Sequence, residues 1–369
     1  MRIQSSILLL SIAPLMLACG KSSDSRPVGD SANMTSSTIS PATAAATATT
    51  PDSQMQAVLD QLAALHGKPI TSLSAKEARE QPSPADAVAA LLIKQGKDTS
   101  AAALIPGVTS ADRTIPGPGG PLPVRIFTPD GTGPFPVIVY YHGGGWVIAN
   151  KETYDAGARS LSKGANAVVV SVDYRRAPEN KFPAQHDDAL ATYKWAAQNA
   201  ASIKGDPTRM ALAGESAGGN LAVATAVAVR DAKLPMPKAI LSVYPIGQPD
   251  TTTASYTQNA DAKPLSRPMM VWFFDQTVRT PADLKDPRID LPSANLAGLP
   301  PVTIINAEID PLRDDGAMLA DALKKAGVPV ERRVYPGVTH EFFGMGAVVD
   351  KAKEAEQYGS GRLKASLGK

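Results

Sequence analysis

The stretch RMALAGESAGGNLAVATAVAV, residues 209–229, joins a short apolar run to an alanine-rich run of helical length. The junction contains the sequence G-x-S-x-G, from Gly214 to Gly218, with Ser216 at its centre. Between a strand and a helix, this motif lifts a serine above a sheet on a very tight turn. Its glycines let the strand and the helix cross closely, and the helix N-terminus favours negative charge that develops nearby. The pattern therefore predicts that Ser216 is a nucleophile.

Short runs rich in Val, Ile, Leu and Tyr recur after Pro106, and each is closed by Gly, Pro or Asp. Helical patterns separate them, for example HDDALATYKWAAQNA (186–200) and NLAVATAVAVRDAK (220–233). Apolar strands that alternate with helices predict an α/β fold with a mostly parallel sheet covered by helices on both faces. Reactive groups in such sheets gather in the loops that leave the carboxyl ends of the strands. The predicted strands lie in LPVRIFTP, PFPVIVYYHGGG, NAVVVSVDYR, RMALAGES, KAILSVYP, PVTIINAEID and VERRVYPG.

A serine hydroxyl is a weak nucleophile unless a base takes its proton, and the chain offers four histidines. His66 lies at the end of a predicted helix, where we expect a surface position. His186 begins a predicted helix, where we expect a solvated side chain. His142 precedes the serine, whereas the fold that carries this motif orders its residues as nucleophile, acid and histidine. His340 follows the last predicted strand, in VTHEFFG, and is the predicted base.

The acid that orients this histidine should follow a strand between the nucleophile and the base. Asp310 comes directly after the apolar run PVTIINAEI. Its predicted task is to fix the imidazole tautomer and to stabilise the imidazolium. Two alternatives remain open at this point. Asp310 could cap the helix that follows, a task that Asp314 or Asp315 could share, and Glu308 is a rival acid that should still lie within the strand.

The stretch YYHGGGWVIAN, residues 140–150, places three consecutive glycines after an apolar run. Glycine loses more backbone entropy on ordering than any other residue, so such a loop needs a reason. Bare backbone allows N–H groups to approach an oxyanion where any side chain would be in the way. We expect His142 to anchor this loop by a hydrogen bond and Trp146 to pack its far end.

Taken in order, HGGGW, VDYRRAPENKFPA, GESAGGN, DPLRDDG and GVTHEFFG resemble the bacterial hormone-sensitive-lipase-like (family IV) esterases of the α/β-hydrolase fold. The resemblance runs from about Gln54 to the C-terminus. It implies a serine carboxylesterase that hydrolyses short- to medium-chain esters through an acyl-enzyme, with no metal and no organic cofactor. The residues that it implies are the triad Ser216, Asp310 and His340, and an oxyanion hole formed by the N–H groups of Gly144, Gly145 and Ala217.

The resemblance also implies a helical cap around the active site. Residues 53–105 match the family's N-terminal cap segment, and a cap-side insertion is expected at about 247–279 of the catalytic domain 106–369. Glu215 stands where many members carry Asp or Thr, and we expect no change of mechanism from it. A second acid so close to the triad could nonetheless bias the response to pH.

Two other functions remain open on the same residues. A triad does not distinguish an ester from an activated amide, because specificity lies in the cap and pocket, so an amidase or deacetylase is an alternative. The other is a non-catalytic binding protein built on a hydrolase fold. Retention of all three predicted triad residues argues against that second alternative.

The composition narrows the possible partners. The 369 residues are 43% hydrophobic and 20% charged with a net charge of +2, which is typical of a globular protein. The sequence contains no dense Lys/Arg run, so it does not suggest a nucleic-acid partner. Four histidines and one cysteine, without C-x-x-C or H-E-x-x-H, do not predict a transition-metal site. We expect a small-molecule ester as partner, and the oligomeric state stays open.

The N-terminus, MRIQSSILLLSIAPLMLACGKSS, carries a basic residue and then an apolar run of roughly a dozen residues. This run is too short for a bilayer span of about 20 residues, and it predicts a secretory signal. Its end is similar to a bacterial lipoprotein signal. We therefore expect residues 1–18 to be removed, Cys19 to be lipidated, and residues 19–52 to form a flexible tether. The body would then be a membrane-anchored lipoprotein that faces the periplasm or the cell exterior. The alternative is ordinary cleavage near Gly20, which discards Cys19.

Overall fold

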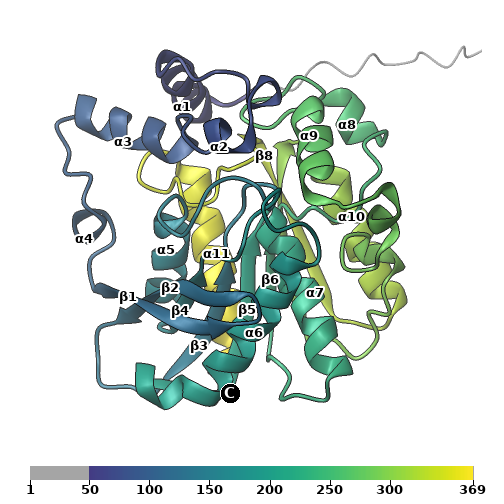
Figure 1. Cartoon of the computed structure of the whole chain (residues 1–369). Helices are drawn as coiled ribbons and strands as arrows, with labels where there is room; N and C mark the ends of the chain where they lie inside the picture. Colours follow the sequence, from purple (N-terminus) through teal and green to yellow (C-terminus); the bar gives the residue numbers. More distant parts are fainter. Residues whose placement is uncertain (1–49, 369) are drawn as a thin grey trace, which may run out of the picture. The chain divides into compact units, whose positions relative to one another are not determined.

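The computed structural model describes residues 50–368 (Figure 1). The predicted signal peptide, Cys19 and most of the predicted tether lie outside these residues. Asp52, at the end of that predicted tether, caps the first helix by accepting a hydrogen bond from Met55 N. Its own N–H donates to the carbonyl of Gly337 at 2.8 Å. In this part of the chain, no helix combines the length and the apolar character that a membrane crossing requires.

One mixed sheet of eight strands forms the centre of residues 50–368, in the order β1-β2-β4-β3-β5-β6-β7-β8. β1 pairs with β2, and β2 with β4, in antiparallel fashion, and every other neighbouring pair is parallel. The predicted mostly parallel sheet is therefore confirmed. The strands are β1 (Val108–Gly117), β2 (Gly120–Pro129), β3 (Phe135–Tyr141), β4 (Val168–Val172), β5 (Gly205–Glu215), β6 (Ile240–Val243), β7 (Val302–Ile309) and β8 (Val330–Thr339).

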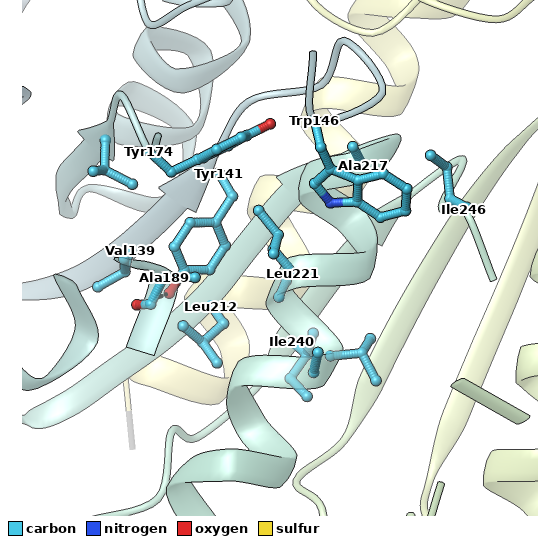
Figure 2. Close-up of a cluster of buried hydrophobic side chains, with 14 of the residues drawn as sticks. Val139, Tyr141, Trp146, Tyr174, Ala189, Leu212, Ala217, Leu221, Ile240 and Ile246 are labelled. Atoms are coloured by element: carbon cyan, nitrogen blue, oxygen red, sulfur yellow. Dashed lines mark hydrogen bonds between the residues drawn. The ribbon is translucent and has the colours of Figure 1, made fainter. Parts of the chain in front are cut away.

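Helices cover both faces of this sheet, because the central strands are apolar on both sides. Val139 and Tyr141 of β3 belong to one hydrophobic cluster together with Leu221 (Figure 2). Ile138 and Tyr140 alternate with them and belong to a second cluster on the other face. The first cluster is covered by α6 (Ala184–Asn199), α7 (Ala217–Asp231) and α10 (Arg313–Lys325), and the second by α5 (Asp155–Ala165) and α11 (Asp350–Leu367).

Two helical segments approach the loops at the carboxyl ends of the strands. Arg79, which ends the second helix, donates to the carbonyls of Val147 and Ala177 at 2.8 and 2.7 Å. The ring of Phe273 lies where a β-carbon on Gly145 would be. The segments comprise α1 (Ser53–Ala64), α2 (Ala75–Ala78), α3 (Pro84–Lys94) and α4 (Ala101–Leu104), and then α8 (Ala254–Gln258) and α9 (Arg267–Thr277).

Three elements were not predicted from the sequence. β1 is an edge strand whose side chains are mostly exposed, so VTSADRTIPG lacks the apolar run used to predict the other strands. α5 and α11 are rich in polar and small residues, including DAGARSLSKGA and KEAEQYGSGRLK, and lack the apolar runs used to predict the other helices. The helical cap segment expected at 53–105 is divided by the 3₁₀ turn Ile70–Ser72.

Candidate active site

Ser216 lies between the end of β5 and the start of α7, on a turn that the flanking glycines make possible. Its backbone has φ 56° and ψ −117°, a strained conformation for a residue with a side chain. A β-carbon on Gly214 would overlap the carbonyl of Gly218, and one on Gly218 would overlap the carbonyl of Tyr141. The two glycines are therefore required by the close crossing of strand and helix.

Ser216, His340 and Asp310 form one chain of hydrogen bonds. His340 Nε2 lies 3.0 Å from Ser216 Oγ, and His340 Nδ1 lies 2.8 Å from Asp310 Oδ2. All three residues are buried. Ser216 follows the carboxyl end of β5, Asp310 that of β7 and His340 that of β8. This arrangement can take a proton from the serine hydroxyl at Nε2 while a carboxylate stabilises the opposite nitrogen.

Two effects compete on the imidazole of His340. Burial disfavours its charged form and lowers its pKa, while the charge and hydrogen bond of Asp310, together with the charge of Glu341, raise it. The attractive effects win, so the net pKa of His340 is raised above the ordinary value. The site is therefore built to stabilise an imidazolium.

The rival acid Glu308 and the two possible capping residues, Asp314 and Asp315, have partners other than the histidine. Glu308 is part of β7 and accepts a hydrogen bond from Gly337 N at 2.8 Å. Asp314 accepts from Ser255 N at 2.8 Å. Asp315 accepts from Gln248 Nε2 at 2.8 Å and from the backbone of the segment that follows β6. Asp314 and Asp315 thus hold the segment that leads to α8.

Asp310 combines two of the roles proposed for it. Its Oδ2 contacts the histidine, while its Oδ1 accepts the N–H of Leu312 at 2.8 Å. Leu312 is the N-cap residue of α10, so the same carboxylate also orders the turn into that helix. Asp310 can therefore orient the histidine and support the turn at the same time.

The glycine loop presents bare backbone beside the serine. Gly144 and Gly145 have φ angles of +95° and +58°, in the left-handed region that favours glycine. The N–H groups of Gly144, Gly145 and Ala217 have no hydrogen-bond acceptor among residues 50–368. Three donors are thus free to bind an oxygen atom of another molecule.

His142 lies beneath this loop and away from Ser216. Its Nδ1 is 2.8 Å from the carbonyl of Gly143, and its ring stacks on Tyr174 at 4.2 Å between centroids. Tyr174 in turn donates its hydroxyl proton to the carbonyl of His142 at 2.9 Å. Burial lowers the pKa of His142 to about 4, so the ring is neutral at pH 7 and Nδ1–H is the donor. Trp146 is fully buried at the other end of the loop.

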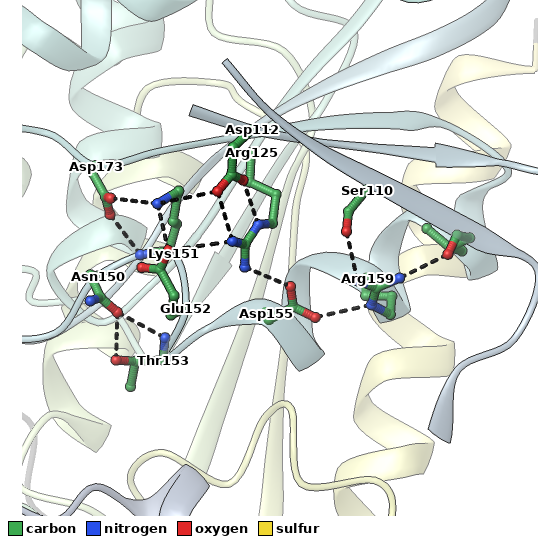
Figure 3. Close-up of polar contacts among 11 residues, drawn as sticks. Ser110, Asp112, Arg125, Asn150, Lys151, Glu152, Thr153, Asp155, Arg159 and Asp173 are labelled. Atoms are coloured by element: carbon green, nitrogen blue, oxygen red, sulfur yellow. Dashed lines mark hydrogen bonds and ion pairs between the residues drawn. The ribbon is translucent and has the colours of Figure 1, made fainter. Parts of the chain in front are cut away.

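Ion pairs hold the residues that follow the glycine loop (Figure 3). Asp173 accepts the N–H of Lys151 at 2.7 Å and pairs with its ammonium group at 3.2 Å. Asn150 Oδ1 accepts from Thr153 N at 2.9 Å. These contacts fix the backbone between the glycine loop and α5. They thereby hold Tyr154, the residue directly before this helix.

The expectation of a solvated His186 is wrong. The side chain is buried, and its Nε2 lies 3.1 Å from Asn220 Oδ1 and 3.2 Å from the carbonyl of Arg288. Burial lowers its pKa to about 4. Its place at the start of a helix suggested solvent, but Phe182 and Trp146 cover the ring.

Two carboxyl groups near Ser216 and His340, the buried Glu215 and the partly exposed Glu341, carry contacts that the sequence did not reveal. Glu215 accepts hydrogen bonds from the hydroxyls of Tyr140 and Tyr244, and burial raises its pKa to about 8. Glu341 lies 2.6 and 2.7 Å from the hydroxyl of Tyr154 through its two carboxylate oxygens. The signal for both was their position next to a triad residue, in GES and in HEF.

The comparisons with known proteins agree with this geometry. A family profile described as the alpha/beta hydrolase fold matches residues 138–344. The carboxylesterase NlhH of Mycobacterium tuberculosis is 40% identical over 270 residues, which span 72% of this chain and 85% of that protein. An ethyl acetate hydrolase of Pseudomonas putida is 34% identical over 241 residues, or 64% of this chain and 76% of that protein.

Solved structures give the same result. A hyperthermophilic esterase from the archaeon Pyrobaculum calidifontis is similar to this chain with a TM-score of 0.76 and 34% identity. The match covers 86% of this chain and 98% of that chain. The predicted α/β-hydrolase fold and the predicted activity on carboxylic ester bonds are thereby confirmed. The chain belongs to the hormone-sensitive-lipase-like family of α/β-hydrolase esterases.

Proposed function

We propose that this esterase is a serine carboxylesterase that cleaves short- to medium-chain esters through an acyl-enzyme on Ser216. The observation that carries the proposal is the unbroken chain from Ser216 Oγ through His340 to Asp310, at 3.0 and 2.8 Å. A serine with a base at this distance, and an acid behind the base, is the arrangement that activates a hydroxyl for acyl transfer.

The proposed reaction has two halves. Ser216 Oγ attacks the ester carbonyl while His340 Nε2 takes its proton, and Asp310 stabilises the imidazolium. The C–O bond to the alcohol then breaks as His340 returns the proton to the leaving oxygen, and the acyl group stays on Ser216. Water then attacks the acyl-enzyme while His340 takes its proton. The C–O bond to Ser216 breaks as His340 returns this proton to Oγ, and the carboxylic acid leaves.

The oxyanion of each tetrahedral intermediate would accept hydrogen bonds from Gly144, Gly145 and Ala217. Two observations support this assignment: these N–H groups have no acceptor within the described residues, and Ala217 begins a helix. Loss of one such donor typically costs about 10²–10³ in turnover.

A preference for short chains is supported by the activity of one relative and by the position of Phe273. The Pseudomonas putida relative is an ethyl acetate hydrolase. In this chain the Phe273 ring lies against Gly145, so a bulky side chain closes the space next to the proposed oxyanion site. Long acyl chains would have to pass this ring.

The test is a series of p-nitrophenyl esters of increasing acyl length, assayed with the wild type, Ser216→Ala and His340→Ala. We expect an initial burst of nitrophenol in the wild type, the highest kcat/KM for short chains, and no burst in either variant. Near-normal turnover by Ser216→Ala would overturn the proposed nucleophile. The same series as anilides tests the amidase alternative, which requires comparable kcat/KM values on the amides.

The location of the enzyme is a separate proposal that rests on the N-terminal sequence. We propose that the chain is exported, lipidated at Cys19 and held at a membrane, with its body facing the periplasm or the cell exterior. The lipoprotein-like signal and the Ser/Thr/Ala-rich segment after it support this location.

A further inference from the structure

Glu341 follows the proposed base directly, and its carboxylate lies beside the reactive nitrogen. Its Oε1 is 3.7 Å from His340 Nε2, the same nitrogen that faces Ser216 Oγ. Asp310 contacts the other nitrogen of the ring. The imidazole therefore has one carboxylate on each side.

Tyr154 holds this second carboxylate in place. Its hydroxyl is within 2.7 Å of both oxygens of Glu341, and it is the carboxylate's hydrogen-bond donor among residues 50–368. The same hydroxyl packs against Gly143, where a β-carbon would overlap it. Burial, together with the charge of Glu341, raises the pKa of Tyr154 well above its ordinary value, so the phenol stays a donor. The pair thus fills the space between the glycine loop and His340.

The backbone at Glu341 would suit glycine better. Its φ of 69° lies in the left-handed region, where a β-carbon is unfavourable. A strained position that carries a long acidic side chain points to a function for that side chain. The side chain is 20% exposed, whereas His340 and Ser216 are almost completely buried.

We propose that Glu341, held by Tyr154, is a positioning residue that stabilises the imidazolium of His340 from the Nε2 side. This inference rests on the proposed function, in which His340 becomes cationic in both halves of the reaction. A negative charge at 3.7 Å favours that cation without taking its proton, and burial of the imidazole strengthens the effect.

The charges around Glu341 and His340 agree with this assignment. The charge of Glu341 contributes to the raised pKa of His340. Burial and the charge of Asp310 raise the pKa of Glu341, and the charge of His340 and the hydrogen bond from Tyr154 lower it, so the net pKa of Glu341 lies above its ordinary value. The other titratable groups that surround Glu341 and His340 are Asp310, Tyr154, Tyr244, Glu215, Tyr140, Tyr174 and His142.

The experiment measures ethanol release from a short-chain ethyl ester between about pH 5 and 9. An ethyl ester is used because its leaving oxygen needs a proton from the imidazolium of His340. Glu341→Gln removes the charge, so the pKa of the imidazole falls. We expect the acidic limb of kcat/KM to move by about one pH unit to lower pH, and kcat to fall about tenfold, since one pH unit corresponds to a tenfold change in imidazolium stability.

Two further variants separate this role from a structural one. Glu341→Gly relieves the backbone strain, so it should fold at least as well as the wild type and still show the lower kcat and the moved limb. Glu356→Gln is the matched control, because Glu356 accepts the N–H groups of Gly344 and Gly346 in the same loop at 3.1 and 3.0 Å. This control should leave the acidic limb in place.

Tyr154→Phe completes a double-mutant cycle. It should reproduce part of the effect alone and add nothing to Glu341→Gln, because the phenol acts through the carboxylate. An unmoved acidic limb in both Glu341 variants, an equal movement in Glu356→Gln, or additive effects of Tyr154→Phe would each overturn the inference. Ser216→Ala separates a failure of the proposed function from a failure of this inference. Activity of Ser216→Ala would refute the proposed function. A burst in the wild type together with an unmoved acidic limb in the Glu341 variants would refute only the role of Glu341.

Discussion

Glu215 offers a stringent test of how burial and hydrogen bonds set the charge of the carboxyl group next to Ser216. Its carboxyl group is buried directly before Ser216 and contacts two phenol hydroxyls, from Tyr140 and Tyr244. Burial favours the protonated form, whereas the two hydrogen bonds favour the carboxylate. Burial wins, and the pKa of Glu215 is raised from 4.5 to about 8. The perturbation that tests this balance is Glu215→Gln, which keeps the shape and removes the titration.

The magnitude follows from the two pKa values of Glu215. Between pH 4.5 and about 8 the folded chain binds one proton that the unfolded chain has released. The free energy of unfolding therefore falls as pH rises through this window, by about 1.4 kcal/mol per pH unit. Over the whole window the loss is on the order of 5 kcal/mol, and it is absent below pH 4.5, where both states are protonated.

The assay is urea unfolding of the wild type and Glu215→Gln at several pH values, followed by circular dichroism. The variant should gain stability relative to the wild type steadily as pH rises toward 8, and its turnover should stay within a few-fold of wild type. Glu354→Gln, at an exposed site, controls for the loss of one charge and should show no such trend. A wild type that gains stability relative to Glu215→Gln as pH rises would mean that the two phenols outweigh burial, and the reasoning would be refuted.

Three further outcomes follow from the geometry. Asp310→Asn should lower kcat by about 10⁴, as expected when the acid no longer fixes the tautomer, and steady-state rates near wild type would exclude Asp310 as the acid. Gly145→Ala should lower turnover by about 10²–10³, because its β-carbon would overlap the ring of Phe273 and displace the loop. Gly361→Ala, where an added β-carbon meets nothing within 4 Å, is its control and should keep full activity. Cys19→Ser should release the protein from membrane fractions, and continued lipid labelling of that variant would contradict the anchor.

The sequence was most informative where one residue type is required by the local backbone. Gly214 and Gly218 must lack side chains for the turn to close, so the motif predicted both the turn and the place of Ser216. Asp310 and His340 were found because each follows a predicted strand, and the carboxyl ends of parallel strands meet at one edge. The structure places both side chains on one hydrogen-bond chain with the serine.

The environment of buried polar groups could not be predicted in the same way. His186 was expected in solvent because it begins a predicted helix, yet Phe182 and Trp146 cover its ring. The partners of Glu215 and Glu341 come from three other loops and strands, and no local pattern indicates them. Contacts of this kind depend on the packing of the whole sheet and its loops.

The central claim is that Ser216 carries the acyl group between the two halves of the reaction. The most direct measurement is mass spectrometry of the enzyme quenched in acid during turnover of a p-nitrophenyl ester. The account predicts an increase in mass by one acyl group, located in the peptide that contains Ser216 and absent from Ser216→Ala. An acyl group on another residue, or turnover by Ser216→Ala without any adduct, would contradict it.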